Sequence, residues 1–129
     1  MSAELNFIGR IETPYTAVKD CPKNIQPDGP LCRLILNHEY IEGMQGLIFG
    51  QRILILYWLE NTDRTAVVQS TRQGKAGTFA LRSPHRPNPI GAAVLPIESL
   101  ENGQITVRGL DCLNNTKLLD IKPAVYHES

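Results

Sequence analysis

Residues 82–91, which read RSPHRPNPIG, carry the densest set of side chains in the sequence that could do chemistry. Three prolines within six positions fix φ at their own sites and restrict the residues before them, so we expect an extended, stiff backbone. A stiff segment loses little entropy when it closes on a ligand. The prolines donate no hydrogen bonds, and they leave main-chain carbonyls that no neighbouring strand can fully pair.

The polar side chains of this proline–arginine segment suit the recognition of anions and bases. Arg82 and Arg86 can each hold a carboxylate or a phosphate through two parallel hydrogen bonds. Asn88 offers both a donor and an acceptor to an adenine edge, and His85 changes its protonation near neutral pH. A rigid structural loop with solvated arginines explains the same residues about equally well. A proline-motif ligand is less favoured, because apolar runs flank the segment.

A second polar cluster follows near the C-terminus, where Asp111, Asn114 and Asn115 precede the sequence DIKP at residues 120–123. Asp120 and Lys122 are two positions apart, so they lie on the same side of an extended strand. The simpler account is a surface ion pair of small energetic value. The functional alternative is a wall of the same site, with Asp120 orienting a hydrogen-bond donor.

Short β-strands must position these groups. Apolar runs bounded by Gly and Pro turns predict strands at Leu5–Ile11, Leu31–Leu36, Ile53–Leu59, Ile90–Leu100 and Gln104–Leu110. The run at 53–59 is almost continuously apolar, which favours a central strand buried on both faces. Asn102-Gly103 predicts a hairpin between the last two runs, and Gly109 is expected to mark a bulge. Residues 38–47 predict one helical turn or a compact loop.

The pattern as a whole predicts an all-β fold. Sustained helical periodicity and the glycine-rich fingerprint of a dinucleotide fold are both missing from the sequence. Short strands with Gly and Pro turns favour a small closed β-barrel of mainly antiparallel strands with few helical turns. At 129 residues, the chain is expected to form one domain over residues 1–129.

Composition excludes several functional classes. Thirteen basic and thirteen acidic side chains leave no net charge, so a field over the whole protein that attracts nucleic acid is absent. Arg72 and Lys75 precede the proline–arginine segment and allow a local basic patch, although a solvated loop is the simpler account. Three scattered cysteines without metal-type spacing indicate a reducing cytoplasm and no metal site. The longest apolar run is too short for a membrane helix, and no signal peptide is recognisable.

Taken together, the two clusters resemble the TsaA-like family, also called the TrmO-type tRNA (adenine-N6)-methyltransferases, which includes YaeB-like and VirR-like proteins. One hallmark resembles GTFA at residues 77–80 followed by the proline–arginine segment. Another resembles GLD at 109–111 followed by LDIKP at 119–123. Further similarity lies in FIG at 7–9 and TPY at 13–15, and in ILYW at 55–58. The resemblance covers nearly the whole chain in the expected order.

The resemblance implies a small barrel, usually dimeric, that binds S-adenosylmethionine without a dinucleotide-type fold. Family members methylate the exocyclic nitrogen of threonylcarbamoyl-adenosine beside the tRNA anticodon. We therefore expect a cytoplasmic S-adenosylmethionine-dependent tRNA methyltransferase that forms a homodimer with its site near the interface, with no metal and no membrane contact.

The resemblance and the residue chemistry together assign site residues. The methyl-donor site is expected to include Pro22, Lys23, Asn24, Leu59, Glu60, Phe79, Arg82, Arg86, Asn88, Ala92, Asn115, Thr116, Lys117 and Leu118. His85 or Asp120 is expected to accept or steer the proton that the acceptor nitrogen loses. Arg86 and Lys122 are expected to contact the RNA substrate.

The chain departs from the family pattern at three places. It reads Asn115-Thr116-Lys117 where the family usually has Gly-Thr-Pro, and Ala124 where the family usually has tyrosine. Lys23 replaces the usual arginine of the Pro-Arg-Gln or Pro-Arg-Asn turn, so a planar fork of donors is lost. These departures leave open a non-catalytic module that binds S-adenosylmethionine or RNA. A regulatory or scaffold protein is a third, less favoured alternative.

Overall fold

The computed structural model describes residues 2–125 and 127–128 as strands, 3-10 helices and connecting loops. The strands are β1 (Gly9–Glu12), β2 (Leu31–Leu36), β3 (Arg52–Trp58), β4 (Val68–Thr71), β5 (Gly74–Gly77), β6 (Ile90–Pro96), β7 (Ser99–Glu101), β8 (Gln104–Arg108) and β9 (Thr116–Pro123). The 3-10 helices are η1 (Val18–Asp20), η2 (His38–Met44) and η3 (Thr78–Ala80). The mostly-β prediction is confirmed. Of the helical turn and the compact loop that residues 38–47 allowed, the structure has the helical alternative, as the seven-residue 3-10 helix η2.

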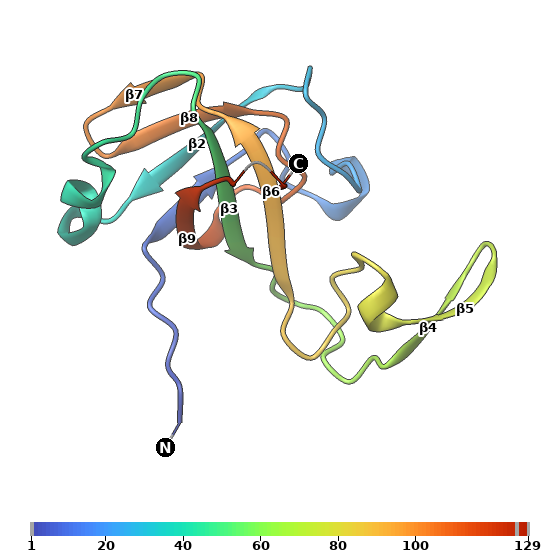
Figure 1. Ribbon diagram of the computed structural model, residues 1–129. Helices are drawn as coiled ribbons and strands as arrows, with labels where there is room; N and C mark the ends of the chain where they lie inside the picture. The colour runs from blue at the N-terminus through green and yellow to red at the C-terminus, as the bar shows by residue number, and fades with distance from the viewer. Residues whose placement is uncertain (1, 126, 129) are drawn as a thin grey trace.

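Seven of the strands form one curved sheet with the order β6-β3-β9-β1-β2-β8-β7 (Figure 1). The sheet is open, so the predicted closed barrel is wrong. Curvature brings β6 close to β8, but β8 already pairs with β2 on one side and with β7 on the other. The edge strands of the sheet are β6 and β7, and in the described residues they do not pair with each other, so the ring stays open.

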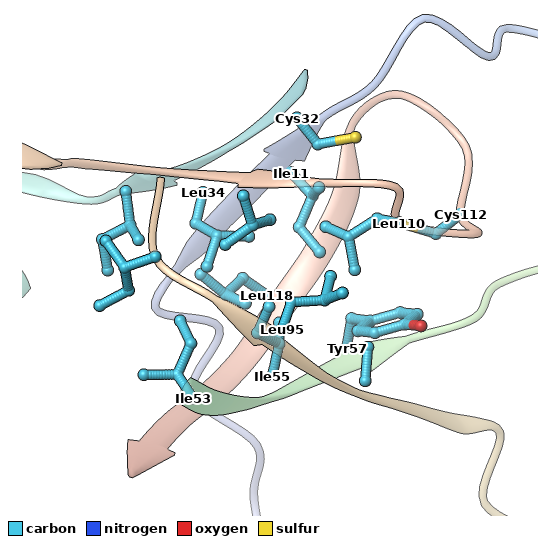
Figure 2. Packing of buried hydrophobic residues seen from close by; sticks show 14 of the residues in the cluster. Ile11, Cys32, Leu34, Ile53, Ile55, Tyr57, Leu95, Leu110, Cys112 and Leu118 are labelled. Atoms are coloured by element: carbon cyan, nitrogen blue, oxygen red, sulfur yellow. The ribbon is translucent and has the colours of Figure 1, made fainter. Parts of the chain in front are cut away.

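The core lies on the concave side of this sheet, where alternate residues of the strands point inward (Figure 2). In β3 the buried residues are Ile53, Ile55 and Tyr57, whereas Leu54 and Leu56 are only half-buried. The expectation of a strand buried on both faces is therefore wrong. No second layer covers the outer face of β3 in the described part of the chain, and its apolar residues there remain partly exposed.

Turn chemistry determines two strand ends. Asn102-Gly103 connects β7 and β8, with φ of +79° at the glycine, so the predicted hairpin is confirmed. Gly109 does not mark a bulge: it lies beyond β8 with φ of +84°, and its N–H donates to the carbonyl of Pro30. The bulge lies in β9, where Leu118 pairs with Tyr57 and Asp120 with Leu56, leaving Leu119 as the extra residue.

Residues 59–89 connect β3 to β6, and the part beyond Glu60, residues 61–89, is called the arm below. Within it, β4 and β5 pair in a separate two-stranded sheet, which Figure 1 shows in yellow and green, projecting away from the seven-stranded sheet. The proline–arginine segment forms the returning half of the arm. The fold therefore places that segment at an edge of the main sheet, where it enters β6.

Candidate functional site

Arg86 holds the proline–arginine segment in shape from within. Its Nη1 donates to the carbonyls of Leu81 and Ser83 at 2.9 and 3.1 Å, and its Nη2 donates to the carbonyl of Thr78 at 3.1 Å. The carbonyl of Ser83 belongs to the proline–arginine segment, where the sequence predicted carbonyls without strand partners, whereas those of Leu81 and Thr78 precede it. Both terminal nitrogens of Arg86 are thus engaged with main chain, and its expected contact with a ligand stays a prediction.

The outgoing half of the arm docks against the same segment. Arg64 donates from Nε to the carbonyl of Pro87 at 2.7 Å, and its guanidinium lies 5.1 Å from the ring centroid of Trp58. The N–H of Asp63 donates to Nδ1 of His85 at 3.0 Å. Asn88 accepts a long hydrogen bond of 3.4 Å from Arg64. The site residues expected on this segment therefore lie in a braced loop rather than a free one.

Arg82 lies at the open edge of the main sheet. β6 is an edge strand, so the carbonyl of Ala92 has no strand partner, and Nη2 of Arg82 donates a short hydrogen bond to it. The strand register places Gly91, Tyr57 and Leu118 side by side across β6, β3 and β9. This register brings the expected residues Ala92 and Leu118 to the same end of β3.

Leu59 and Glu60 join this group directly. The N–H of Leu59 donates to the carbonyl of Pro89 at 2.8 Å, and Glu60 pairs with Lys117 at 2.8 Å. Three segments that are far apart in the sequence therefore meet beyond the end of β3. Each of them is a segment to which the family resemblance assigns the methyl donor.

The pair Tyr57 and Asp111 forms the buried floor beside this group. Tyr57 is 2% exposed, and its hydroxyl donates to Oδ1 of Asp111 at 2.5 Å. Burial, with the negative charge of Asp111, raises the pKa of the Tyr57 hydroxyl far above 10.0, and Arg82 is close enough to oppose that shift. A Cβ on Gly91 would lie 2.3 Å from Cε2 of the Tyr57 ring, so glycine is required there.

The loop that follows the Pro22–Asn24 turn is fastened to the segment that carries Asp111. Burial raises the pKa of the Cys21 thiol, and the charge of Asp111 raises it further. A hydrogen bond of 2.8 Å from the N–H of Gln26 to the carbonyl of Gly109 fastens the loop after the turn. Sequence reasoning included Asp111 in a polar cluster but missed it as a site residue. The sequence feature that could have identified Asp111 as a site residue is its position at the end of the GLD motif, residues 109–111.

Asp120 lies on the face of the sheet opposite Tyr57, which is the face that also carries Lys117. Leu56 and Tyr57 point to opposite faces of the sheet, and their partners Asp120 and Leu118 do the same, because the bulge at Leu119 inserts one residue. Asp120 accepts from the N–H of Ile121 at 2.8 Å and lies 3.6 Å from Nζ of Lys122, both side chains being half exposed. Asp120 and Lys122 thus form the surface ion pair that was the simpler account of this cluster.

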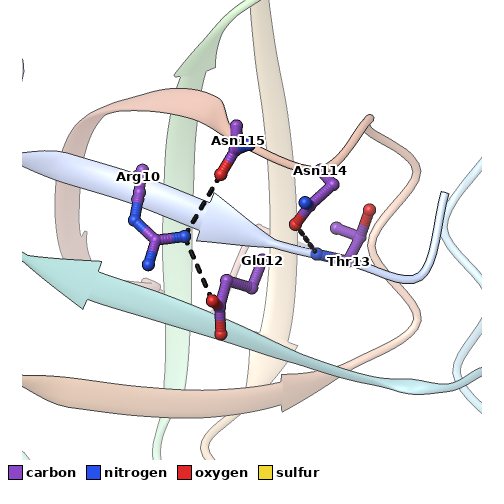
Figure 3. A network of polar contacts seen from close by, with 5 residues as sticks. All are labelled: Arg10, Glu12, Thr13, Asn114 and Asn115. Atoms are coloured by element: carbon purple, nitrogen blue, oxygen red, sulfur yellow. Dashed lines mark hydrogen bonds and ion pairs between the residues drawn. The ribbon is translucent and has the colours of Figure 1, made fainter. Parts of the chain in front are cut away.

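Asn115 occupies a turn before β9, with φ of +70°. Its side chain accepts a 3.2 Å hydrogen bond from Arg10, which also pairs with Glu12, while Asn114 accepts from the N–H of Thr13 (Figure 3). Asparagine adopts this left-handed conformation more readily than most residues. The departure from the family's glycine at Asn115 therefore preserves the turn.

Metal-binding clusters and membrane-spanning helices are both missing from the described residues, 2–125 and 127–128. No group of three or more His, Cys, Asp or Glu side chains in these residues is placed to hold a metal ion. In the same part of the chain, no helix has the length and apolar character needed to span a membrane.

Phe79, which was expected at the methyl-donor site, is 87% exposed on η3.

Comparisons with known proteins agree with the fold and with the order of the motifs. The family model of the tRNA-methyltransferase O N-terminal domain matches residues 10–128. A curated relative, the probable S-adenosyl-L-methionine-binding protein VirR of Rhizobium radiobacter, is 42% identical over 123 residues, covering 94% of this chain and 70% of its own. The tRNA (adenine(37)-N6)-methyltransferase of Homo sapiens is 47% identical over 51 residues, which are 40% of this chain and 12% of the human protein.

Solved structures are also similar to this chain in fold. The crystal structure of TrmO from Pseudomonas aeruginosa superposes with a TM-score of 0.79 at 27% identity, covering 98% of this chain and 58% of that one. This chain thus spans less than two thirds of the length of the TrmO structure. With the family model matched over almost its whole length, the chain belongs to the family of the tRNA-methyltransferase O N-terminal domain.

Proposed function

We propose that this protein binds S-adenosylmethionine and transfers its methyl group to tRNA, the acceptor being the exocyclic nitrogen of threonylcarbamoyl-adenosine beside the anticodon. The observation that carries the proposal is that three separate segments meet at the end of β3, through the hydrogen bond from Leu59 to Pro89 and the Glu60–Lys117 ion pair. Arg82 lies on the free edge of the neighbouring strand β6, at Ala92. The names of the bacterial and human relatives support the same cofactor and substrate class. We expect the protein to act in the cytoplasm as a homodimer.

The charges around the Tyr57 hydroxyl fit the methionyl tail of the methyl donor, which is a zwitterion. Arg82 supplies a guanidinium there and Asp111 a carboxylate, one of whose oxygens is already held by Tyr57. Arg82 would bind the α-carboxylate of the tail, and Asp111 its α-ammonium group. The Pro22–Asn24 turn, close to Asp111, would form a further wall.

Methyl transfer by this route needs positioning more than bond activation. The sulfonium of S-adenosylmethionine supplies an activated methyl group, so the residues of the chain contribute mainly by aligning donor and acceptor. The methyl–sulfur bond breaks as the methyl–nitrogen bond forms, and the N–H proton of the acceptor passes to a base. His85 and Asp120 remain the proposed bases. The lone pair of His85 at Nδ1 already accepts from Asp63, so the loop would have to shift for His85 to act there.

A non-catalytic S-adenosylmethionine-binding module is the second candidate. The observation that favours it is the engagement of both proposed bases: His85 with Asp63, and Asp120 with Ile121 and Lys122 on the opposite face of the sheet. Under this alternative the Arg82–Asp111 pair binds the methyl donor, but no group removes the acceptor proton.

Calorimetry followed by labelled methyl transfer to total tRNA tests the proposal. The unsubstituted protein should bind S-adenosylmethionine saturably, and Arg82→Ala should weaken that binding by roughly 10- to 100-fold, the effect of removing a charged hydrogen bond. Arg33→Ala, an exposed arginine on β2, is the matched control and should bind normally. Absence of saturable binding at millimolar methyl donor defeats the proposal. Binding without transfer selects the non-catalytic alternative.

A further inference from the structure

The arm carries a net positive charge, and an excess of acidic side chains in the rest of the protein balances it. Residues 61–89 hold five basic side chains and one acidic one, whereas the remainder holds eight basic and twelve acidic side chains. A chain with no net charge is therefore divided into a cationic arm and an anionic body. A polyanion that approaches the molecule is attracted by the arm and repelled by the body.

Two of the arm's cations are free to act on another molecule. Arg72 and Lys75 flank the tip of the β4–β5 hairpin and are exposed. Among the residues that the structure describes, neither has an ion-pair or hydrogen-bond partner. Arg86 and Arg64, by contrast, are engaged with carbonyls of the arm itself. The tip thus presents uncompensated positive charge on a part of the fold that projects away from the seven-stranded sheet (Figure 1).

Hydrogen bonds at the base of the arm fix the hairpin against the rest of the arm. Thr78 is 1% exposed, and its hydroxyl donates to the carbonyl of Ala66 at 3.1 Å and accepts from Gln69 at 2.8 Å. The same Gln69 nitrogen donates to the carbonyl of His85 at 2.8 Å. These hydrogen bonds tie the hairpin to the proline–arginine segment, so the tip is held in a defined place relative to Arg82.

The arm also has a hollow suited to an extended chain. An open groove of about 510 Å³ runs along residues 65–70 and is bordered by Asp63 and His85. Its lining includes most of β4 and, from the proline–arginine segment, His85. With about 3.3 Å per residue, the four residues of β4 span roughly 13 Å from this lining to the hairpin tip.

We propose that the arm is the surface on which the phosphate backbone of the RNA docks, with Arg72 and Lys75 gripping phosphates and the groove beside His85 guiding the strand toward Arg82. Phosphate contacts of this kind position a nucleic acid without reading its sequence. This inference rests on the proposed function, because it places the acceptor of the methyl group on the arm.

The exposed apolar residues of the arm, Val67, Val68 and Phe79, raise the alternative that a second copy of the chain covers it. The observations favour RNA, because the unpaired charge is concentrated at the tip, where neither valine lies. Contact between copies is one outcome of the experiment below, and it would overturn the proposal.

The experiment compares the double variant Arg72→Gln/Lys75→Gln with a matched pair on the body, Lys19→Gln/Arg33→Gln, all four residues being exposed. Affinity for unmodified tRNA is measured by fluorescence anisotropy at several salt concentrations. Removing one cation from a phosphate should reduce the slope of log affinity against log salt by about 0.7–0.9. The slope for the arm variant should therefore be shallower by about 1.4–1.8, and its affinity at 0.1 M salt roughly 25- to 60-fold weaker. The body variant should keep the slope of the unsubstituted protein.

Three results would overturn the proposal: an unchanged slope in the arm variant, an equal decrease in both variants, or dissociation of an oligomer caused by the arm variant alone in sedimentation. Thermal unfolding of both variants confirms that they fold. Calorimetry with S-adenosylmethionine on the same samples separates this inference from the proposed function. Failure of the unsubstituted protein to bind the methyl donor defeats the function, whereas normal methyl-donor binding with an unchanged RNA slope defeats only the docking arm.

Discussion

Gly91→Ala should disrupt the buried floor of the candidate site. The added Cβ would lie 2.3, 2.7 and 2.8 Å from three ring carbons of Tyr57, and real Cβ atoms essentially never approach so closely. The ring is 2% exposed and packed in the core, so it can retreat only by displacing its neighbours. Overpacking of this kind costs about 1–3 kcal/mol.

The same displacement pulls the Tyr57 hydroxyl away from Asp111. A hydrogen bond to a charged group contributes about 1.5–3 kcal/mol. The free energy of unfolding should therefore fall by about 3–5 kcal/mol, which corresponds to a decrease in Tm of roughly 10–20 °C for a domain of this size. Gly43→Ala is the matched control, because no atom lies within 4 Å of its Cβ position, and it should leave stability nearly unchanged.

Urea unfolding followed by fluorescence measures the effect directly, since Trp58 is the only tryptophan and lies beside Tyr57 on β3. The clash is tested by a double-mutant cycle with Tyr57→Val, which removes the ring. In that background Gly91→Ala should cost less than about 0.5 kcal/mol. The steric account is refuted if Gly91→Ala is harmless in the native background, or if it costs the same with and without the ring.

Other interactions in the structure lead to four further predictions. Burial raises the pKa of the Cys112 thiol and of the Tyr57 hydroxyl, so the unfolded chain releases these protons first, and stability should fall as pH rises from about 9; urea midpoints between pH 8 and 10.5 test this, and a flat profile would contradict it. Arg86→Lys keeps the charge but removes the fork to three carbonyls, so S-adenosylmethionine affinity should fall several-fold in calorimetry, whereas an unchanged affinity would show that the clamp does not shape the site. Asn115→Gly should unfold within about 0.5 kcal/mol of the unsubstituted protein, whereas Asn115→Val should be destabilised by about 1–2 kcal/mol at φ of +70°, and equal stabilities would argue against backbone control of that turn. Asp111→Asn keeps the acceptor for Tyr57 but removes the charge, so it should weaken S-adenosylmethionine binding while sparing methylthioadenosine, which has no amino-acid tail; an equal decrease for both ligands would reduce Asp111 to a structural role.

Neighbouring residues along the chain were sufficient to predict much of the local structure and the family. A short apolar run predicted β2 at Leu31–Leu36 with the observed bounds, and the positive φ that Asn-Gly tolerates predicted the β7–β8 hairpin. The prolines of residues 82–91 predicted a stiff segment with unpaired carbonyls, which is the state that Arg86 and Arg64 satisfy. These features arise from restrictions on φ and from side-chain alternation, both of which act over a few residues.

Which polar groups share a site, by contrast, depends on the tertiary structure. Asp120 was an expected proton acceptor, but the extra residue Leu119 rotates it to the face opposite Tyr57, and a one-residue shift in pairing leaves no trace in composition. Tyr57 and Asp111 meet across 54 positions of sequence, and the described edge strands β6 and β7 do not pair, which leaves the predicted barrel open. Each of these outcomes follows from the pairing of strands that are distant in the sequence. The register of such pairs cannot be predicted from the pattern of neighbouring residues.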